Sequence, residues 1–288
     1  MKTRLRHIIF VAFLAIGMSN NVFAWDHDGH GAIGILAVNQ LQVDARLKLH
    51  EILGVLDEET LIKACNWPDA IRESAEWEWS EPLHYVNLPR GEKYYSVARD
   101  CPERQCVTEA IKNYAGVLSN PVASGEERRQ AFAWLCHFTG DIHHPLHAGF
   151  ADDRGGNDVE VTFHGKSMDL HEFWDQGLIE HRVGDWKNLL ALLQTYHINQ
   201  MAGENWSEGM VDDWTEESHQ LVETVIYPPN SEIGRRYEEE SWELAQQRIL
   251  TAASRLALII NTVLSNQFAL GAQAELLKQT QVPKADEQ

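Results

Sequence analysis

Apolar residues recur at intervals of three and four along most of the chain, which is the spacing of one face of an α-helix. Strand signals are sparse, and the clearest is the alternation of β-branched residues at 159–163, after the turn-forming Gly155-Gly156-Asn157, with a short partner strand expected after Gly165. The sequence contains no internal repeat and no low-complexity linker. We expect a mainly α-helical protein with one short β-hairpin, and helices at residues 32–41, 43–53, 107–118, 127–141, 186–193 and 239–264.

The first 24 residues have the pattern of a secretory signal peptide. Lys2, Arg4 and Arg6 precede an apolar run over residues 8–17, and residues 22–24 offer a small-residue cleavage site. A membrane anchor is the alternative, but the run is shorter than the roughly 20 residues that cross a bilayer, and no second such run follows. We expect cleavage after residue 24, a secreted or periplasmic location, and no membrane span in the mature chain.

The mature chain is expected to form a single domain over residues 25–270. A length of 288 residues is near that of two average domains but also fits one large domain, and 44% of the residues are hydrophobic, enough for a substantial core. After Gly271 the density of apolar residues falls, so the segment 271–288 is expected to be a flexible tail.

The charge balance is strongly acidic, with 43 Asp and Glu against 24 Lys and Arg and a net charge of −19. Removal of the basic leader would make it more negative still. Proteins that hold nucleic acid by a basic surface neutralise phosphates with Lys and Arg, so this composition argues against such a surface. If phosphate is the substrate, another source of positive charge must attract it.

Four cysteines allow three disulfide connectivities, and export makes disulfides permissible. Cys101 and Cys106 are close enough in sequence to staple one loop, which leaves Cys65 and Cys136 as the second pair. Four free thiols are the alternative that the sequence leaves open.

Histidine and aspartate recur at a spacing suited to metal binding. His137 and Asp141 are four residues apart and so share a helix face, and His171 and Asp175 repeat that spacing. Between them, Pro145 is expected to end the helix near residue 144. One such pair often arises by chance, but two pairs with further histidines nearby indicate a cluster. Imidazole and carboxylate together suit zinc, whereas oxygen-only sites suit calcium or magnesium.

The motifs in their order resemble a known family. The chain carries Trp25 with a histidine five residues on, Trp67-Pro68-Asp69-x-x-Arg72, Leu83-His84-Tyr85, the His137 to His147 segment, Gly-Gly-Asn and the second His-x₃-Asp. From Trp25 to about Leu264 it is similar to the secreted trinuclear-zinc nucleases that prefer single strands, the mung-bean and plant bifunctional nuclease type. Their fold is the helical fold shared with zinc phospholipase C.

The resemblance implies three zinc ions with defined ligands. One zinc would be held by Asp69, His84, His137 and Asp141. A second would be held by Asp141, His30 and the amino group and carbonyl of Trp25, so that Asp141 bridges the two. The third would be held by His147, His171 and Asp175.

Roles beyond metal binding follow from the same motifs. Asp69 and Asp141 would be catalytic as ligands, Arg72 would bind a phosphate oxygen, and Asn87 and Asn157 are candidate substrate contacts. Many eukaryotic members have an acidic residue where this chain has Asn87, which leaves the identity of a general base open. Four histidines receive no ligand role: His27, His143, His164, and His144, which stands where the family has Gln and is expected to affect only the groups around the ligands.

The function that the resemblance implies is a secreted zinc-dependent endonuclease. Its substrates would be single-stranded DNA and RNA, cut to 5′-phosphate products, and 3′-nucleotides, and no obligate protein partner is indicated. A zinc phospholipase C is the nearest alternative, although that family tends to have Glu where this chain has Asp175 and a longer gap after the N-terminal Trp. A non-enzymatic secreted protein stabilised by zinc is the other alternative. It is disfavoured because structural zinc sites are usually closed by four protein ligands, whereas the set of His147, His171 and Asp175 leaves room for solvent.

Overall fold

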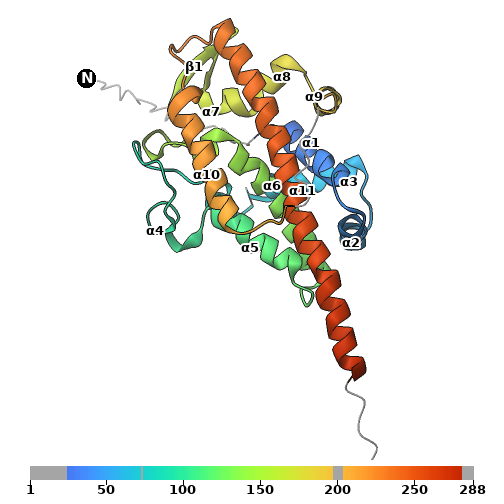
Figure 1. Cartoon of the computed structure of the whole chain (residues 1–288). Coiled ribbons are helices and arrows are strands. Elements are labelled where there is room, and N and C mark those ends of the chain that lie inside the picture. Colours follow the sequence, from blue (N-terminus) through green and yellow to red (C-terminus); the bar gives the residue numbers. More distant parts are fainter. Residues whose placement is uncertain (1–24, 73, 197–203, 281–288) are drawn as a thin grey trace, which may run out of the picture.

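The computed structural model describes residues 25–72, 74–196 and 204–280, so the predicted signal peptide lies outside the described residues. Helices dominate, and the only sheet in these ranges is the hairpin of β1 and β2 (Figure 1). The α-helices are α1 Asp26–Asn39, α2 Val43–Leu53, α3 Glu58–Arg72, α4 Val97–Asp100, α5 Val107–Ser119, α6 Gly125–His143, α7 Leu170–Glu172, α8 Leu178–Arg182, α9 Trp186–Leu193, α10 Gly209–Leu221 and α11 Arg235–Thr280. The expected mainly α class with a short hairpin is confirmed.

Shorter elements join these helices. The 3₁₀ segments are η1 Glu78–His84, η2 Pro102–Arg104, η3 Pro145–Ala148 and η4 Ala151–Asp153, the π-helical segments are η5 Phe173–Gly177 and η6 Val222–Ile226, and the strands are β1 Glu160–Phe163 and β2 Lys166–Asp169. The strands are antiparallel, with Phe163 opposite Lys166. His164 and Gly165 form the turn between them, and both have positive φ, as a tight two-residue hairpin turn requires.

Helix α6 lies at the centre of the molecule. It begins with a capping box between Ser124 and Glu127, which satisfies backbone N–H groups at the helix start. Its second half, residues 131–143, is buried on all sides, and it packs against α1, α3, α5, α10 and α11 (Figure 1). Polar side chains in such a position need compensating partners, because burying them unpaired is costly. The helix ends at His143, before Pro145, as expected.

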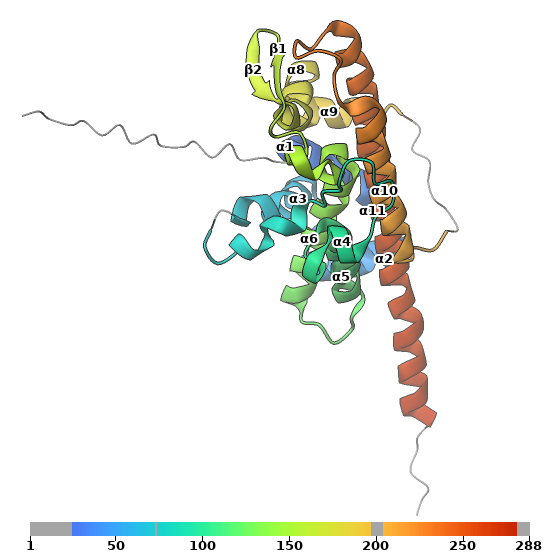
Figure 2. The ribbon, with the colours of Figure 1, turned by 90° about the vertical axis from the view of Figure 1, so that its left-hand side faces the viewer.

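Helix α11 runs along one side of the molecule and contacts α1, α2, α5, α6 and α8 (Figure 2). Its part Arg235–Ser265 is long and apolar enough to cross a membrane, but 67% of its most apolar window is buried inside the protein. The expectation that no second long apolar run follows the leader was therefore wrong, and core packing accounts for this run. The helix continues to Thr280, beyond the 270/271 boundary that composition predicts.

Both disulfide pairs that the sequence favoured are present. Cys65 in α3 is bonded to Cys136 in α6, and Cys101 is bonded to Cys106. Gly34 of α1 faces the first of these bonds, and a Cβ there would lie 2.4 Å from the Cys65 Sγ atom. Glycine at this position therefore lets α1 pack directly against the disulfide that joins α3 to α6.

Candidate metal centre

Nine buried histidine and aspartate side chains converge beside α6, and we call them the buried centre. They come from five separate stretches of the sequence, at residues 30, 69, 84, 137–147 and 171–175, so only the folded chain assembles them. The members are His30 of α1, Asp69 of α3, His84 of η1, His137 and Asp141 of α6, His144 directly after α6, His147 of η3, His171 of α7 and Asp175 of η5.

The first subsite lies between α3, η1 and α6. The His137 Nε2 atom is 3.4 Å from Asp69 Oδ1, 3.5 Å from Asp141 Oδ2 and 3.1 Å from His84 Nδ1. The His84 Nδ1 atom is in turn 3.7 Å from Asp69 Oδ1 and 3.2 Å from Asp141 Oδ2. Four ligands at 2.0–2.1 Å from one tetrahedral zinc ion are separated by about 3.3 Å. These four atoms therefore have the spacing of a zinc ligand set.

Asp141 also faces a second subsite. Its other oxygen, Oδ1, is 3.3 Å from His30 Nε2, so its two oxygens point to different groups of ligands. The neighbouring Gly140 allows this approach, because a Cβ there would lie 2.5 Å from His30 Nδ1. Trp25 is fully buried nearby, and its indole N–H donates to the Gly140 carbonyl at 3.0 Å. The Trp25 carbonyl accepts from the Gly29 N–H and keeps its second lone pair for another contact.

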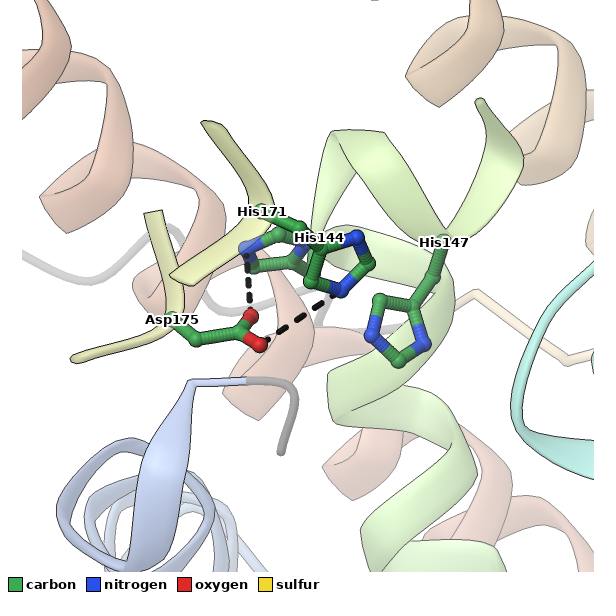
Figure 3. A group of neighbouring side chains, drawn as sticks. All are labelled: His144, His147, His171 and Asp175. Atoms are coloured by element: carbon green, nitrogen blue, oxygen red, sulfur yellow. Dashed lines mark ion pairs between the residues drawn. The ribbon is translucent and has the colours of Figure 1, made fainter. Parts of the chain in front are cut away.

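The third subsite contains His144, His147, His171 and Asp175 (Figure 3). The two oxygens of Asp175 face different imidazoles: Oδ2 is 3.4 Å from His171 Nε2, and Oδ1 is 3.0 Å from His144 Nε2. His171 and Asp175 keep the four-residue spacing although the helix passes from α7 into the π-helical η5. His144 is the member that sequence reasoning left outside the ligand set. Its position two residues before Leu146-His147 was the available signal.

Backbone carbonyls fix the orientation of three imidazoles. The Nδ1–H groups of His137, His147 and His171 donate to the carbonyls of Cys65, His84 and Gly155 at 2.9, 2.6 and 2.7 Å, respectively. With Nδ1 protonated, each ring presents the lone pair of Nε2 to the centre. Such outer hydrogen bonds are typical of histidines that bind metal, because they set both the tautomer and the ring orientation.

Unsatisfied polar atoms provide a test of whether a cation fits. Among the described residues, fifteen buried side-chain nitrogen and oxygen atoms lack a hydrogen bond of good geometry, and twelve of them belong to the buried centre. Both oxygens of Asp141 and both of Asp175 are among the twelve. Buried polar atoms are nearly always paired in native proteins, so a concentration of this kind requires a partner. Cations bound by nitrogen and carboxylate ligands are the partners that fit this donor set.

Without a bound cation, the pKa values of the ligand side chains are shifted in different directions. Burial lowers the pKa of His137, but the carboxylates of Asp141 and Asp69 outweigh it and raise that pKa to about 9. Burial raises the pKa of Asp175 well above its ordinary value, and His171 only partly opposes this shift. A cation would replace the proton on His137 and stabilise the charged form of Asp175, as metal binding generally does for its ligands.

Two of the three predicted substrate contacts lie against ligands, and the third lies beside a residue that orients one. Arg72 NH1 is 3.4 Å from Asp69 Oδ1. Asn157 Nδ2 is 3.3 Å from His171 Nδ1, and the Asn87 Oδ1 atom lies next to Gly155, whose carbonyl orients the same imidazole. The geometry thus brings all three to the edge of the buried centre.

Beside His84 the surface is hollowed by a cavity of about 460 Å³, which sequence reasoning did not find. Trp79 and Tyr114 supply aromatic surface to it, and Leu83 precedes the ligand His84 in the chain. Arg104 and Lys112 also line it, each paired with Glu109. Trp79 is 52% exposed, unlike most tryptophans of this protein. Its exposure could not be read from the sequence, since a tryptophan is more often a core residue.

The unassigned histidines have different surroundings. His27 is exposed beside Asp28. His143 is buried and structural: its Nδ1–H donates to the Thr139 carbonyl, and Arg255 donates to its Nε2. His164 lies outside the buried centre, near His181.

Comparison with known proteins gives a consistent result. A family model described as S1/P1 Nuclease matches residues 25–265, a range that includes every residue of the buried centre. Endonuclease 4 of Arabidopsis thaliana is 27% identical over 300 residues, covering 93% of this chain and 98% of that protein. Endonuclease 3 of the same plant is 31% identical over 231 residues, covering 78% and 75%. Nuclease P1 of Penicillium citrinum is 27% identical over 270 residues, covering 85% and 100%.

Proposed function

The chain belongs to the S1/P1 nuclease family, and we propose that it is a secreted or periplasmic enzyme that uses three zinc ions. The protein is a nuclease, a hydrolase of phosphodiester bonds with nucleic acid as substrate, and it prefers single strands. The proposal adds the metal and its number, the ligands, the location, 5′-phosphate products from both DNA and RNA, and activity on 3′-nucleotides.

The metal assignment rests on one observation: the two oxygens of Asp141 face different groups of ligands. Asp141 directs Oδ2 to His84 and His137 and Oδ1 to His30, which is the arrangement of a ligand shared by two ions. We assign one zinc to Asp69, His84, His137 and Asp141, a second to Asp141, His30 and the amino group and carbonyl of Trp25, and the third to His147, His171 and Asp175. The surplus of unsatisfied ligand atoms supports this occupancy.

Bound zinc would supply the positive charge that holds phosphate and would lower the pKa of a water molecule that attacks it. The chain's own residues then act around the phosphate. Arg72 is already fixed by Asp69 and is suited to bind a non-bridging oxygen as negative charge develops in the transition state. Asn157 is suited to donate a hydrogen bond to the substrate from its place beside His171. The strongly acidic chain would thus attract phosphate locally, at the buried centre, and not through its surface as a whole.

Preference for single strands is consistent with the cavity beside His84. An unpaired base can stack on an aromatic face at little cost, whereas a duplex must first open. Trp79 is exposed at this cavity and is backed by Trp77, at a ring distance of 5.8 Å. We assign Trp79 as a stacking surface for a base next to the scissile phosphate.

Other features support export and disfavour lipid as the substrate. The two disulfides are typical of proteins outside the reducing cytosol, and the proposed signal peptide precedes Trp25. The relatives described above are named nuclease or endonuclease, which favours a nuclease over a phospholipase C.

One experiment tests the metal and the reaction together. The processed protein is analysed for zinc by mass spectrometry and assayed on single-stranded DNA, duplex DNA, RNA, a 3′-mononucleotide and phosphatidylcholine vesicles. We expect at least three zinc ions per chain, activity on the three single-stranded or mononucleotide substrates, and none on the vesicles. Fewer than three ions in a fully active enzyme would overturn the trinuclear assignment, and hydrolysis of phosphatidylcholine would overturn the substrate assignment.

The stacking role has its own test. Trp79→Ala is expected to raise KM for single-stranded DNA by about tenfold, since a base stacked on an aromatic side chain contributes roughly 1–3 kcal/mol. Trp186→Ala is the matched control, because Trp186 is a partly buried tryptophan of α9 that does not line this cavity. An unchanged KM in Trp79→Ala would remove the assignment.

A further inference from the structure

A second group of metal-ligating side chains lies on the surface, away from the buried centre. It consists of His164, His181 and Glu238, and we call it the hairpin cluster. His164 is in the turn between β1 and β2, His181 is in the last turn of α8, and Glu238 is in the first turn of α11. The buried centre uses none of these three residues.

The hairpin cluster has distances suited to a metal ion. Glu238 Oε2 is 3.4 Å from His164 Nε2, and Glu238 Oε1 is 3.7 Å from His181 Nε2. These separations fall within the range measured between the ligand atoms of the first subsite of the buried centre. They are close to the spacing of about 3.3 Å expected between ligands of one tetrahedral ion.

The surroundings hold the three ligands in place. Arg182 donates to Glu238 Oε1 at 3.2 Å, which orients a carboxylate that is only 7% exposed. The rings of His164 and His181 stack at 4.1 Å with an interplanar angle of 27°, and Phe163 packs against both. His164 itself has a φ of 47°, in the left-handed region that few residues other than glycine adopt. This backbone conformation aims its ring at His181 and Glu238.

We propose that the hairpin cluster is a fourth metal site of this protein, one that binds zinc at the surface and clamps the β-hairpin onto α8 and α11. Two imidazoles and one carboxylate are a zinc ligand set, and the exposure of both histidines leaves room for water as the remaining ligand. The bond between Arg182 and the carboxylate is the kind of outer contact that fixes a metal ligand. Its three ligands are separate from those assigned to the nuclease reaction.

Its location suggests what the clamp does. Phe163, which precedes His164, packs against Phe173 at a ring distance of 5.0 Å, and Phe173 begins the π-helical segment that carries Asp175. Zinc at the hairpin cluster would therefore stiffen the hairpin that packs against the segment carrying Asp175.

The test is a difference in zinc content at equilibrium. The unmodified protein, His164→Ala, His181→Ala and the control His50→Ala, an exposed histidine of α2, are each dialysed against the same micromolar concentration of free zinc and analysed by mass spectrometry. We expect His164→Ala and His181→Ala to bind one zinc fewer than the unmodified protein and His50→Ala. Because only the difference counts, the result does not depend on how many ions the buried centre holds.

Two further readouts complete the test. A crystal soaked in zinc chloride should show an anomalous peak between the three side chains at the zinc absorption edge. Single-strand nuclease activity of His164→Ala should stay within about twofold of the unmodified protein, as for most surface substitutions, which shows that the variant is folded. Equal zinc content in all four proteins would overturn the proposal, as would a crystal with zinc peaks only in the buried centre.

Discussion

The buried centre and the hairpin cluster are built from the same two types of side chain but are supported in different ways. In the buried centre, three imidazoles are held by backbone carbonyls and every ligand is shielded from water. In the hairpin cluster, the two imidazoles are held by stacking on each other and the carboxylate by a hydrogen bond from Arg182, and both histidines are exposed. The first arrangement is enclosed by the core of the fold, and the second is assembled at the surface by the hairpin turn, α8 and α11. Substitutions in the buried centre should therefore affect both catalysis and stability, and those in the hairpin cluster only local order.

Metal removal should give the largest effect and separate the two regions. Chelation would leave Asp69, Asp141 and Asp175 in a buried space without compensating cations, so we expect complete loss of nuclease activity and a fall in the melting temperature. Calorimetry of chelated and zinc-loaded protein measures the second effect. His164→Ala shows how much the hairpin cluster alone contributes to the melting temperature of the zinc-loaded protein. If chelation lowered the melting temperature of the unmodified protein by no more than this amount, the buried centre would not be the stabilising site.

Within the buried centre, Asp141→Asn is expected to be the most damaging carboxylate substitution. One side chain serves two ions, and the loss of its charge should reduce activity by roughly 1,000-fold, at the upper end of losses for a single electrostatic contact in an active site. Zinc content should fall as well. Asp158→Asn, an exposed carboxylate, is the matched control. Comparable or larger losses in Asp69→Asn or Asp175→Asn would contradict the bridging role.

An extension before Trp25 should give the next largest loss of activity. Trp25 is fully buried, and its free α-amino group, with an unperturbed pKa near 8, is assigned as a zinc ligand. One extra residue before Trp25 would turn that amine into an amide, and we expect about a hundredfold loss of activity with less bound zinc. A tag at the C-terminus is the control. Equal rates and equal zinc content with the extension would refute the assignment.

His144 offers a finer test. Its Nε2 atom is 3.0 Å from Asp175 Oδ1, and His144→Ala should cost about tenfold in activity by releasing that carboxylate, as is usual when an outer partner of a metal ligand is lost. Burial, opposed only in part by Asp141, lowers the pKa of His144 to about 3, so the ring is neutral and acts without a charge. His144→Gln should then restore most of the rate, because a neutral amide can take the place of the neutral imidazole beside Asp175. Failure of this rescue would show that the imidazole itself binds metal.

Asn87→Ala should have the smallest effect, about threefold, because an amide cannot act as a general base near neutral pH and a metal-activated water does not require one. Steady-state rates on single-stranded DNA, with zinc content measured in parallel, check this. A near-complete loss with zinc content intact would mean that Asn87 takes part in the reaction directly.

The sequence was informative where ligands share a helix and less so elsewhere. The four-residue spacing predicts that His137 and Asp141 lie on one face, and Pro145 correctly predicts the end of α6. Pro68 has the opposite effect: it obscures α3, because proline is normally excluded from helix interiors, although the helix Glu58–Arg72 continues through it. The π-helical geometry of η5 also leaves no local signal. Packing against the core determines both the continuation of α3 through Pro68 and the π-helical geometry of η5.

The hairpin cluster could not be predicted because its ligands share no segment. His164 receives no ligand role from the family motifs, and His181 and Glu238 lie outside those motifs. Their proximity depends on a left-handed turn residue and on the contact between α8 and α11. Tertiary structure alone determines these features, and the same holds for the exposure of Trp79.

The disulfide between Cys65 and Cys136 has a consequence for when the enzyme becomes active. Cys136 adjoins His137 in the chain, and the Cys65 carbonyl accepts the hydrogen bond that orients the His137 ring. In a reducing compartment this bond does not form, and α3 and α6 lose the link that fixes both the ligand and its acceptor. On the proposed route of export, the newly made chain would therefore reach full activity only after leaving the cytosol. Together with the uncleaved leader before Trp25, the missing disulfide would keep single-stranded nucleic acid inside the cell from being cut.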